Sequence, residues 1–134
     1  MFYFDVNMKK ICCLLLFVLL CSCQKEDIYL SEQDSGHNII LDIGQTAIIT
    51  LAENRTTGYG WEFEIEPQQQ DVIGNIKEKH IYQKTKLIGA GGIKEFRFKA
   101  ENAGKVNISA YYRRPWEDVD KKNLHSVTYT IIAE

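Results

Sequence analysis

The stretch KVNISAYYR, residues 105–113, decides the fold because its apolar and polar side chains alternate. A period of two places Val106, Ile108, Ala110 and Tyr112 on one face of an extended strand and their neighbours on the other. The same alternation recurs at residues 61–65, 96–100 and 127–133. Half-buried strands repeated in this way predict an all-β protein.

Extending the pattern along the chain gives seven expected strands, at about residues 38–43, 46–52, 61–66, 72–83, 93–100, 105–113 and 125–133. Glycine, asparagine and proline turn signals separate them, and no long window has the spacing of an amphipathic helix. Seven short strands in about 100 residues favour an immunoglobulin-like antiparallel β-sandwich, with a small barrel as the alternative.

The composition is that of one globular domain. The chain has 134 residues, 45% hydrophobic and 25% charged, with 16 basic against 18 acidic side chains and a formal net charge of -2. These values argue against a disordered chain and a multi-span membrane protein. The near-neutral balance leaves no broad basic surface, so nucleic acid is not expected as a partner.

The first residues are typical of a secretory signal. Lys9 and Lys10 precede an apolar run at 11–20 that is too short to cross a bilayer as a helix, which makes a transmembrane anchor the weaker reading. The run ends at LCSC, residues 20–23, which resembles a bacterial lipobox with cysteine where alanine, serine or threonine is more common. We predict a lipoprotein signal peptide over residues 1–22 and lipid on Cys23, with cleavage but no lipidation as the alternative.

The polar residues 23–37 are expected to form a lipidated tether ahead of a domain at 38–134. Residues 24–27, QKED, resemble a short acidic signal that sends some lipoproteins to the outer face of the outer membrane in Gram-negative bacteria. A plain solvated tether is the alternative. The expected location is therefore the cell envelope, at the outer membrane of a Gram-negative bacterium, with the N-terminal lipid as the protein's only link to a membrane. The sequence leaves open whether the domain faces the outside or the periplasm.

The cysteines limit how the domain can be stabilised. They are Cys12, Cys13, Cys21 and Cys23, and none follows residue 23. Cleavage before Cys23 would leave one thiol, which the lipid consumes. The domain is therefore expected to contain no disulfide and to be held together by its core.

The loop between the second and third expected strands carries two threonines and a glycine. Its residues are Asn54, Arg55, Thr56, Thr57, Gly58, Tyr59 and Gly60. Hydroxyl bonds to the nearby backbone and a positive φ at Gly58 predict a compact turn, which a tight strand connection alone would also explain. Trp61 begins the alternating third strand and is expected in the core.

The loop before the fifth expected strand is rich in glycine. Gly89, Ala90, Gly91 and Gly92 suit a close backbone approach or a flexible flap. They do not suit a phosphate cradle, because no helix follows and the spacing differs from nucleotide motifs.

The loop Arg113, Arg114, Pro115, Trp116 and Glu117 holds an aromatic residue on a stiffened turn. Trp116 lies outside the alternation of either neighbouring strand and is the residue type that anchors interfaces. Folding back over the end of the sandwich is the alternative. The loops after the second, fourth and sixth strands of a Greek-key sandwich gather at one end, so the three loops are expected to share one tip.

Together the three loops resemble the signature of the chagasin-like inhibitors of papain-type cysteine peptidases. That signature is Asn-Pro-Thr-Thr-Gly-Tyr-x-Trp, then Gly-x-Gly-Gly, then Arg-Pro-Trp. The matching residues are Asn54, Thr56, Thr57, Gly58, Tyr59, Trp61, Gly89, Gly91, Gly92, Arg114, Pro115 and Trp116. The resemblance spans about residues 38–134, and it departs from the signature at Arg55, which replaces proline and adds a positive charge.

The resemblance implies a reversible inhibitor whose loops wedge into the peptidase cleft. Thr56 and Thr57 would lie over the catalytic cysteine and histidine, the glycine loop would follow the unprimed side, and Trp116 would pack on the primed side. The implied peptidase-binding residues are Asn54, Arg55, Thr56, Thr57, Gly58, Tyr59, Gly89, Ala90, Gly91, Gly92, Arg114, Pro115 and Trp116. The inhibitor would be a monomer before it binds, and it would need no metal or cofactor.

Two other functions are weighed against this hypothesis. An enzyme is not expected, because His37, His80 and His125 have no metal-ligand spacing and nothing marks a nucleophile. The alternative is a surface lipoprotein that binds carbohydrate or another protein. The aromatic residues available for it are Tyr59, Tyr111, Tyr112 and Trp116.

Overall fold

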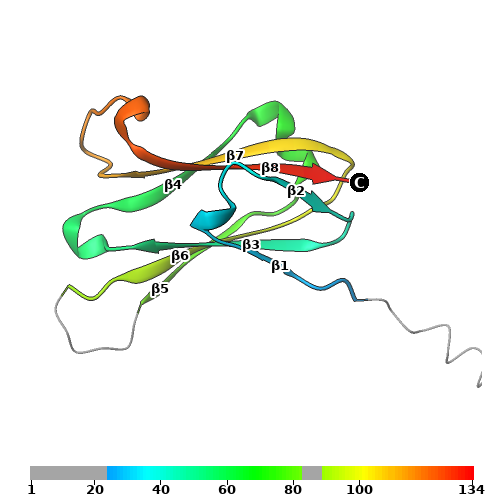
Figure 1. Ribbon diagram of the computed structural model, residues 1–134, viewed down its shortest axis with the longest axis horizontal. Coiled ribbons are helices and arrows are strands. Elements are labelled where there is room, and N and C mark those ends of the chain that lie inside the picture. Colours follow the sequence, from blue (N-terminus) through cyan, green and yellow to red (C-terminus); the bar gives the residue numbers. More distant parts are fainter. Residues whose placement is uncertain (1–23, 83–88) are drawn as a thin grey trace, which may run out of the picture.

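The computed structural model describes residues 24–82 and 89–134, which form two four-stranded sheets packed face to face (Figure 1). The first sheet has the order β1 (Ile28–Leu30), β3 (Thr46–Glu53), β6 (Gly92–Lys99) and β5 (Lys77–Tyr82). The second has the order β2 (Asn38–Leu41), β8 (His125–Ala133), β7 (Gly104–Arg113) and β4 (Gly60–Ile65). The predicted immunoglobulin-like sandwich is confirmed.

Short 3₁₀ turns are the helical elements in this part of the chain. They span Glu32–Asp34, Arg55–Thr57, Pro67–Val72 and Lys121–Asn123. Within residues 24–82 and 89–134, no helix is long and apolar enough to cross a membrane.

The core lies between the sheets and is made by the inward side of each alternation. Val106, Ile108 and Ala110 of β7 are fully buried, as the alternation of that stretch predicts. Trp61 is also buried, and Phe63 stacks on Phe96 of the opposite sheet with ring centroids 4.1 Å apart. Burial of a large apolar side chain contributes about 1.5–3 kcal/mol, so a core of this size can stabilise the domain without a disulfide.

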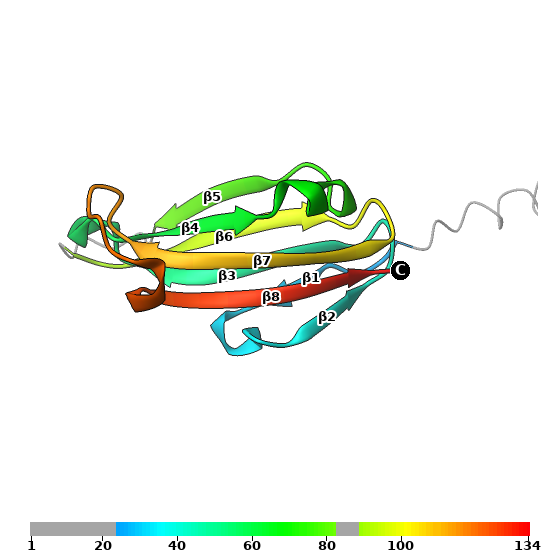
Figure 2. The ribbon, with the colours of Figure 1, turned by 90° about the horizontal axis from the view of Figure 1, so that it is seen from above.

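The connections β3–β4 and β7–β8, and the described residues 89–91 between β5 and β6, lie at one end of the sandwich, at the left of Figure 1. Figure 2 shows the same arrangement from above, with the C-terminus and the approach to β1 at the other end. The first connection crosses between the sheets, whereas the other two are hairpins within one sheet. The predicted gathering of the three loops is therefore confirmed for their described residues.

The N-terminal segment departs from the prediction. Residues 28–30 form β1, which pairs in parallel with β3, and Leu30 is buried in the core. The following turn is capped at Ser31, whose N–H donates to Asp34 Oδ2 at 2.7 Å and whose carbonyl accepts from Tyr129 Oη at 2.8 Å. The folded domain thus begins at residue 28, and the predicted tether over 23–37 is wrong for residues 28–37. A three-residue strand is too short for alternation to reveal.

Two further expectations need correction. The sandwich is not wholly antiparallel, because β1 pairs with β3 and β2 pairs with β8 in parallel. The strand expected at 72–83 is β5 only from residue 77, since Pro67 begins a 3₁₀ turn that runs to Val72. The predicted signal peptide over residues 1–22 and the predicted lipid site at Cys23 lie outside the described residues.

Candidate functional site

The first loop closes on its own side chains. Asn54 Oδ1 accepts hydrogen bonds from the Thr56 N–H at 3.2 Å and the Thr56 hydroxyl at 2.6 Å. The Thr57 hydroxyl donates to the Asn54 carbonyl at 2.6 Å, and Gly58 takes a φ of +84° at the end of the turn. The predicted compact turn is confirmed, and it leaves Thr56 and Thr57 exposed.

Two hydrogen bonds tie the base of this loop across the sandwich. The Asn54 N–H donates to Tyr112 Oη of β7 at 3.0 Å. Trp61 Nε1 on β4 donates to the Ala52 carbonyl on β3 at 2.8 Å. Each bond joins one sheet to the other, so the loop is held on both strands that carry it.

The third loop is braced against the first by Arg114. Its Nε donates to the Thr57 carbonyl at 2.9 Å, and its guanidinium lies 4.4 Å from the centroid of the Tyr59 ring. Glu117 Oε1 accepts from Arg114 Nη1 at 3.0 Å, and this hydrogen bond raises the pKa of Arg114, which keeps the guanidinium charged. Arginine suits this role because its planar group can donate and stack at the same time.

Trp116 is the large aromatic residue that this loop presents to solvent. It is 70% exposed, and its ring lies against Gly58, where an added Cβ would come within 2.3 Å of Trp116 Cη2. The side chain is therefore oriented by the first loop and does not fold over the end of the sandwich. Pro115 beside it is also exposed.

The second loop is described at residues 89–92. Gly89 has a φ of +85°, and its carbonyl accepts a hydrogen bond from Asn54 Nδ2 at 3.2 Å. An added Cβ would lie 2.6 Å from the Ile81 carbonyl oxygen at Gly92 and 3.2 Å from the Glu53 carbonyl oxygen at Gly91. The predicted close backbone approach is confirmed, and it leaves no room for a Cβ at Gly92 and little room at Gly91. Ala90, between Gly89 and Gly91, is partly buried.

The structure brings the three predicted loops together through side chains of their own. We call residues 54–59, 89–92 and 114–116 together the loop tip. Asn54 joins its first and second segments, and Arg114 joins its first and third. The predicted residue Arg55 is exposed at the tip, where its Nη1 donates to Tyr82 Oη at 3.5 Å.

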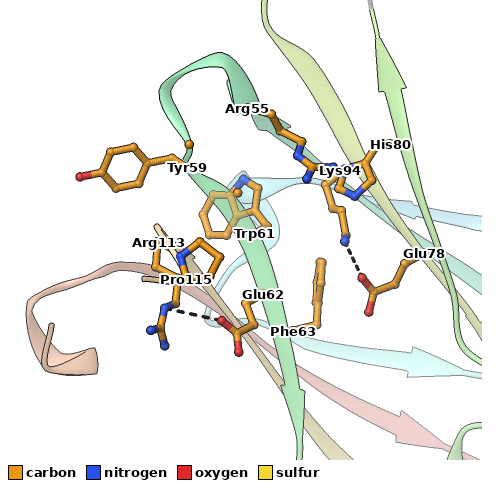
Figure 3. Close-up of a pocket in the computed structure, with 12 residues that line it drawn as sticks. Arg55, Tyr59, Trp61, Glu62, Phe63, Glu78, His80, Lys94, Arg113 and Pro115 are labelled. Carbon is orange, nitrogen blue, oxygen red and sulfur yellow. Dashed lines mark ion pairs between the residues drawn. The ribbon is translucent and has the colours of Figure 1, made fainter. Parts of the chain in front are cut away.

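A pocket of about 400 Å³ lies beside the loop tip, between the edge strands β4 and β5 (Figure 3). Trp61 and Phe63 line it, with Tyr59 and Pro115 on the tip side. Two ion pairs form its walls, Lys94 with Glu78 at 2.5 Å and Arg113 with Glu62 at 3.6 Å. Within the described residues, no three histidine, cysteine, aspartate or glutamate side chains are grouped as a metal site requires.

Sequence reasoning missed two charged residues that are buried inside the sandwich near the loop tip. Glu53 follows Ala47, Ile49 and Leu51 on the buried face of β3, and Lys94 precedes Phe96 on the buried face of β6. A charged residue at an apolar position of an alternating strand is the signal that could have found them. Burial of such a residue requires a partner, which makes its position informative.

The aromatic residues do not form an open platform for a sugar. Tyr59 stacks on Tyr112 with centroids 5.3 Å apart, and the Arg114 guanidinium covers Tyr59. Lys121 Nζ lies 5.2 Å from the centroid of Tyr111. Of the four aromatic residues considered for carbohydrate binding, Trp116 alone is largely exposed.

Comparison with known proteins gives a consistent result. The family model described as chagasin family peptidase inhibitor I42 matches residues 40–131. Chagasin of Trypanosoma cruzi is 28% identical over 88 residues, covering 64% of this chain and 80% of chagasin. Amoebiasin-1 of Entamoeba histolytica is 26% identical over 102 residues, covering 76% of this chain and 93% of that protein.

A solved structure shares the fold. The crystal structure of the cysteine protease inhibitor EhICP2 from Entamoeba histolytica superposes with a TM-score of 0.70 and 24% identity, covering 81% of this chain and 96% of the other.

Proposed function

The chain belongs to the chagasin family of peptidase inhibitors, and on that premise we propose that it inhibits papain-like cysteine peptidases reversibly by inserting the loop tip into the active-site cleft. The observation that carries this proposal is the bracing of the three loops. The Asn54–Gly89 and Arg114–Thr57 hydrogen bonds hold the three loops of the tip in one arrangement before any partner is bound. Loops that are ordered in advance lose little entropy on docking.

The same geometry explains how the loop tip could fill a cleft and escape cleavage. Cleavage requires a scissile carbonyl about 3–3.5 Å from the attacking sulfur and aligned with it. Residues Arg55–Thr57 form a 3₁₀ turn, and the Asn54 side chain caps its start by accepting a hydrogen bond from the Thr56 hydroxyl. A turn of this kind does not offer an extended segment for attack. Thr56 and Thr57 would therefore cover the catalytic groups without reacting.

Trp116 is the proposed anchor of the wedge, and its removal tests the proposal. We expect Trp116→Ala to raise the inhibition constant against papain about thirtyfold, because truncation of a central aromatic anchor typically costs about 2 kcal/mol or more. Ile40→Ala is the matched control, since Ile40 is another large exposed apolar side chain but lies on β2, outside the loop tip. Equal inhibition by folded Trp116→Ala and wild-type protein would refute the wedge.

Thr56→Asp probes the centre of the tip. A carboxylate at this position would lie beside the catalytic thiolate, where repulsion and desolvation oppose binding. We expect a loss of inhibition at least as large as that of Trp116→Ala, measured against the same enzyme. A folded Thr56→Asp protein with unchanged inhibition would place the contact elsewhere.

We also propose that Cys23 carries a lipid that anchors the protein in the cell envelope, at the outer membrane of a Gram-negative bacterium. The lipobox-like residues 20–23 support this, and so does the position of the segment that follows. Lys25 Nζ donates to the Ile43 carbonyl at 2.7 Å, and the Glu26 carbonyl accepts from Gln45 Nε2 at 2.9 Å, at the end opposite the loop tip (Figure 1). A lipid at this end would leave the loop tip facing away from the membrane.

Labelling with radioactive palmitate tests the anchor. Wild-type protein should be labelled and Cys23→Ser should not, whereas the control Cys21→Ser should retain the label because serine is common at that position of a lipobox. Equal labelling of the Cys23→Ser protein would exclude Cys23 as the lipid site. Protease treatment of intact cells would then report whether the domain is exposed at the surface.

A further inference from the structure

A buried carboxylate lies directly beneath the loop tip. Glu53 is the last residue of β3, and its side chain is 2% exposed. Its Oε1 lies 2.5 Å from His80 Nδ1 on β5, and its Oε2 accepts from the Trp61 N–H on β4 at 3.4 Å. The charge therefore lies on the inner face of the sandwich, at a position where the preceding alternation supplies apolar residues.

Stability alone does not account for this residue. Removing a carboxylate from water costs free energy, and replacing a buried ion pair by apolar side chains of similar volume is often neutral or stabilising. An apolar residue at position 53 would continue the buried face of Ile49 and Leu51. A glutamate at this position therefore indicates a role for the groups that its two oxygens bond.

The residues that Glu53 bonds lie on strands that lead into or out of the loop tip. Asn54, the first residue of the first loop, follows it directly, and Trp61 lies just beyond the end of that loop. His80 belongs to β5, which runs toward the second loop, and Gly92 at the end of that loop is the pairing partner of Glu53 in the β3–β6 register. Figure 3 shows His80 and Lys94 of the neighbouring strands pointing toward the pocket beside the tip.

We propose that Glu53 is a positioning residue for inhibition: its buried carboxylate, bonded to His80 and to the Trp61 N–H, sets the first and second loops relative to each other without touching the peptidase. This proposal rests on the proposed function. It adds a residue outside the three loops to the determinants of binding, and it predicts that inhibition and stability respond differently to substitution.

Two variants at position 53 separate these responses. Glu53→Met has a similar volume but no hydrogen-bonding oxygen, so we expect the inhibition constant against papain to rise about tenfold while the melting temperature falls by no more than about 5 °C or rises. Glu53→Gln retains an oxygen for the Trp61 N–H and an amide that can bond His80. It should stay within about threefold of wild type, a rescue that packing alone would not produce.

His80→Leu removes the same bond from the other side and leaves Glu53 in place. If the two residues act through their shared contact, Glu53→Met and His80→Leu will each raise the inhibition constant. The inhibition constant of the double variant will then be no higher than the higher of the two single-variant values. The double variant also contains no unpaired carboxylate, which keeps the test available if His80→Leu unfolds. Losses that add in the double variant would overturn the proposal.

Glu78→Gln is the matched control. Glu78 pairs with buried Lys94 in the wall of the same pocket, and this ion pair joins β5 to β6 outside the loop tip. We expect Glu78→Gln to lower stability with inhibition unchanged. Unchanged inhibition by folded Glu53→Met, together with weakened inhibition by Trp116→Ala, would overturn the role of Glu53 and leave the wedge intact. Unchanged inhibition by Trp116→Ala would instead refute the proposed function itself.

Discussion

The two ends of the sandwich are held together by different kinds of bond. At the end opposite the loop tip, main-chain bonds join the connections: the Gly44 N–H donates to the Ala100 carbonyl at 2.7 Å, and the Glu101 N–H donates to the Val72 carbonyl at 2.9 Å. Side-chain bonds from Lys25, Gln45 and Asn102 add to them. At the loop tip, particular side chains join the loops, with Asn54 and Arg114 as the principal donors. A main-chain bond survives most substitutions, whereas a side-chain bond is lost when that one residue changes.

This difference predicts where the protein tolerates change. Substitutions at the opposite end should affect stability and leave inhibition unaltered, because they do not reach the tip. Substitutions at the loop tip should affect inhibition more than stability, because the braced loops are exposed and contribute little to the core. Paired substitutions of the same type at the two ends test the comparison directly.

Among the paired substitutions at the two ends, a glycine pair is expected to give the largest effect. Gly58 and Gly44 both have positive φ, +84° and +91°, so alanine should destabilise either turn by about 1–2 kcal/mol. At Gly58 the new Cβ would also displace the Trp116 ring, whereas at Gly44 nothing lies within 4 Å. Gly58→Ala should therefore weaken inhibition by about tenfold or more, and Gly44→Ala should not change it.

Measuring the inhibition constants and melting temperatures of both variants checks this prediction. Equal inhibition by the two proteins would show that contact with Gly58 does not orient Trp116.

Arginine at the junction of the loops should give a smaller effect. Arg114→Lys keeps the charge but loses the planar group that bonds Thr57 and covers Tyr59, so inhibition should weaken about fivefold. Arg97→Lys is the control on β6, where the arginine pairs only with Asp27 and Glu95 among the described residues. Equal inhibition constants for Arg114→Lys and Arg97→Lys would mean that the positive charge at position 114 is sufficient and that the planar guanidinium is not required to join the loops.

The departure from the family signature at position 55 should have a slight effect. Arg55 is the first residue of the 3₁₀ turn, and Asn54 before it is extended at φ -125° and ψ 91°, a conformation compatible with a following proline. Arg55→Pro should raise stability by about 0.4–1 kcal/mol and change inhibition less than about threefold in either direction. A large loss of inhibition would reveal a contact made by the Arg55 side chain.

The hydrogen bond of Tyr129 should affect stability alone. Burial raises the pKa of Tyr129 to about 12, above its unfolded value of 10.0, so its share of stability is complete below about pH 10 and is lost as the pH rises toward 12. Tyr129→Phe removes the bond to Ser31, which should lower the free energy of unfolding at pH 7 by about 1 kcal/mol without altering inhibition.

Denaturant unfolding of both proteins between pH 9 and about pH 12 isolates this residue, since other groups titrate alike in the two. The stability advantage of the wild-type protein over Tyr129→Phe should fall by about 2 kcal/mol across that range. A constant difference would mean that the pKa of Tyr129 is the same in the folded and unfolded protein.

Most of the strands and the buried face of each could be predicted, because a period of two is a local property. Residues 105–113 alternate, and β7 spans residues 104–113 with Val106, Ile108 and Ala110 fully buried. The turn at residues 54–58 was equally readable, since Asn54 bonds residues two and three positions away. The short β1 strand was not readable, because its three residues are recognised only by their pairing with β3.

The sequence by itself determined which loops carry unusual residues and that Trp61 belongs to the core. Only the tertiary structure decided that Asn54 meets Gly89, that Arg114 meets Thr57 and that Glu53 meets His80. Those partners are 35, 57 and 27 residues apart, too far for any local pattern to report. They meet because the sandwich brings the ends of strands from both sheets to one place, and that arrangement depends on how the whole core packs.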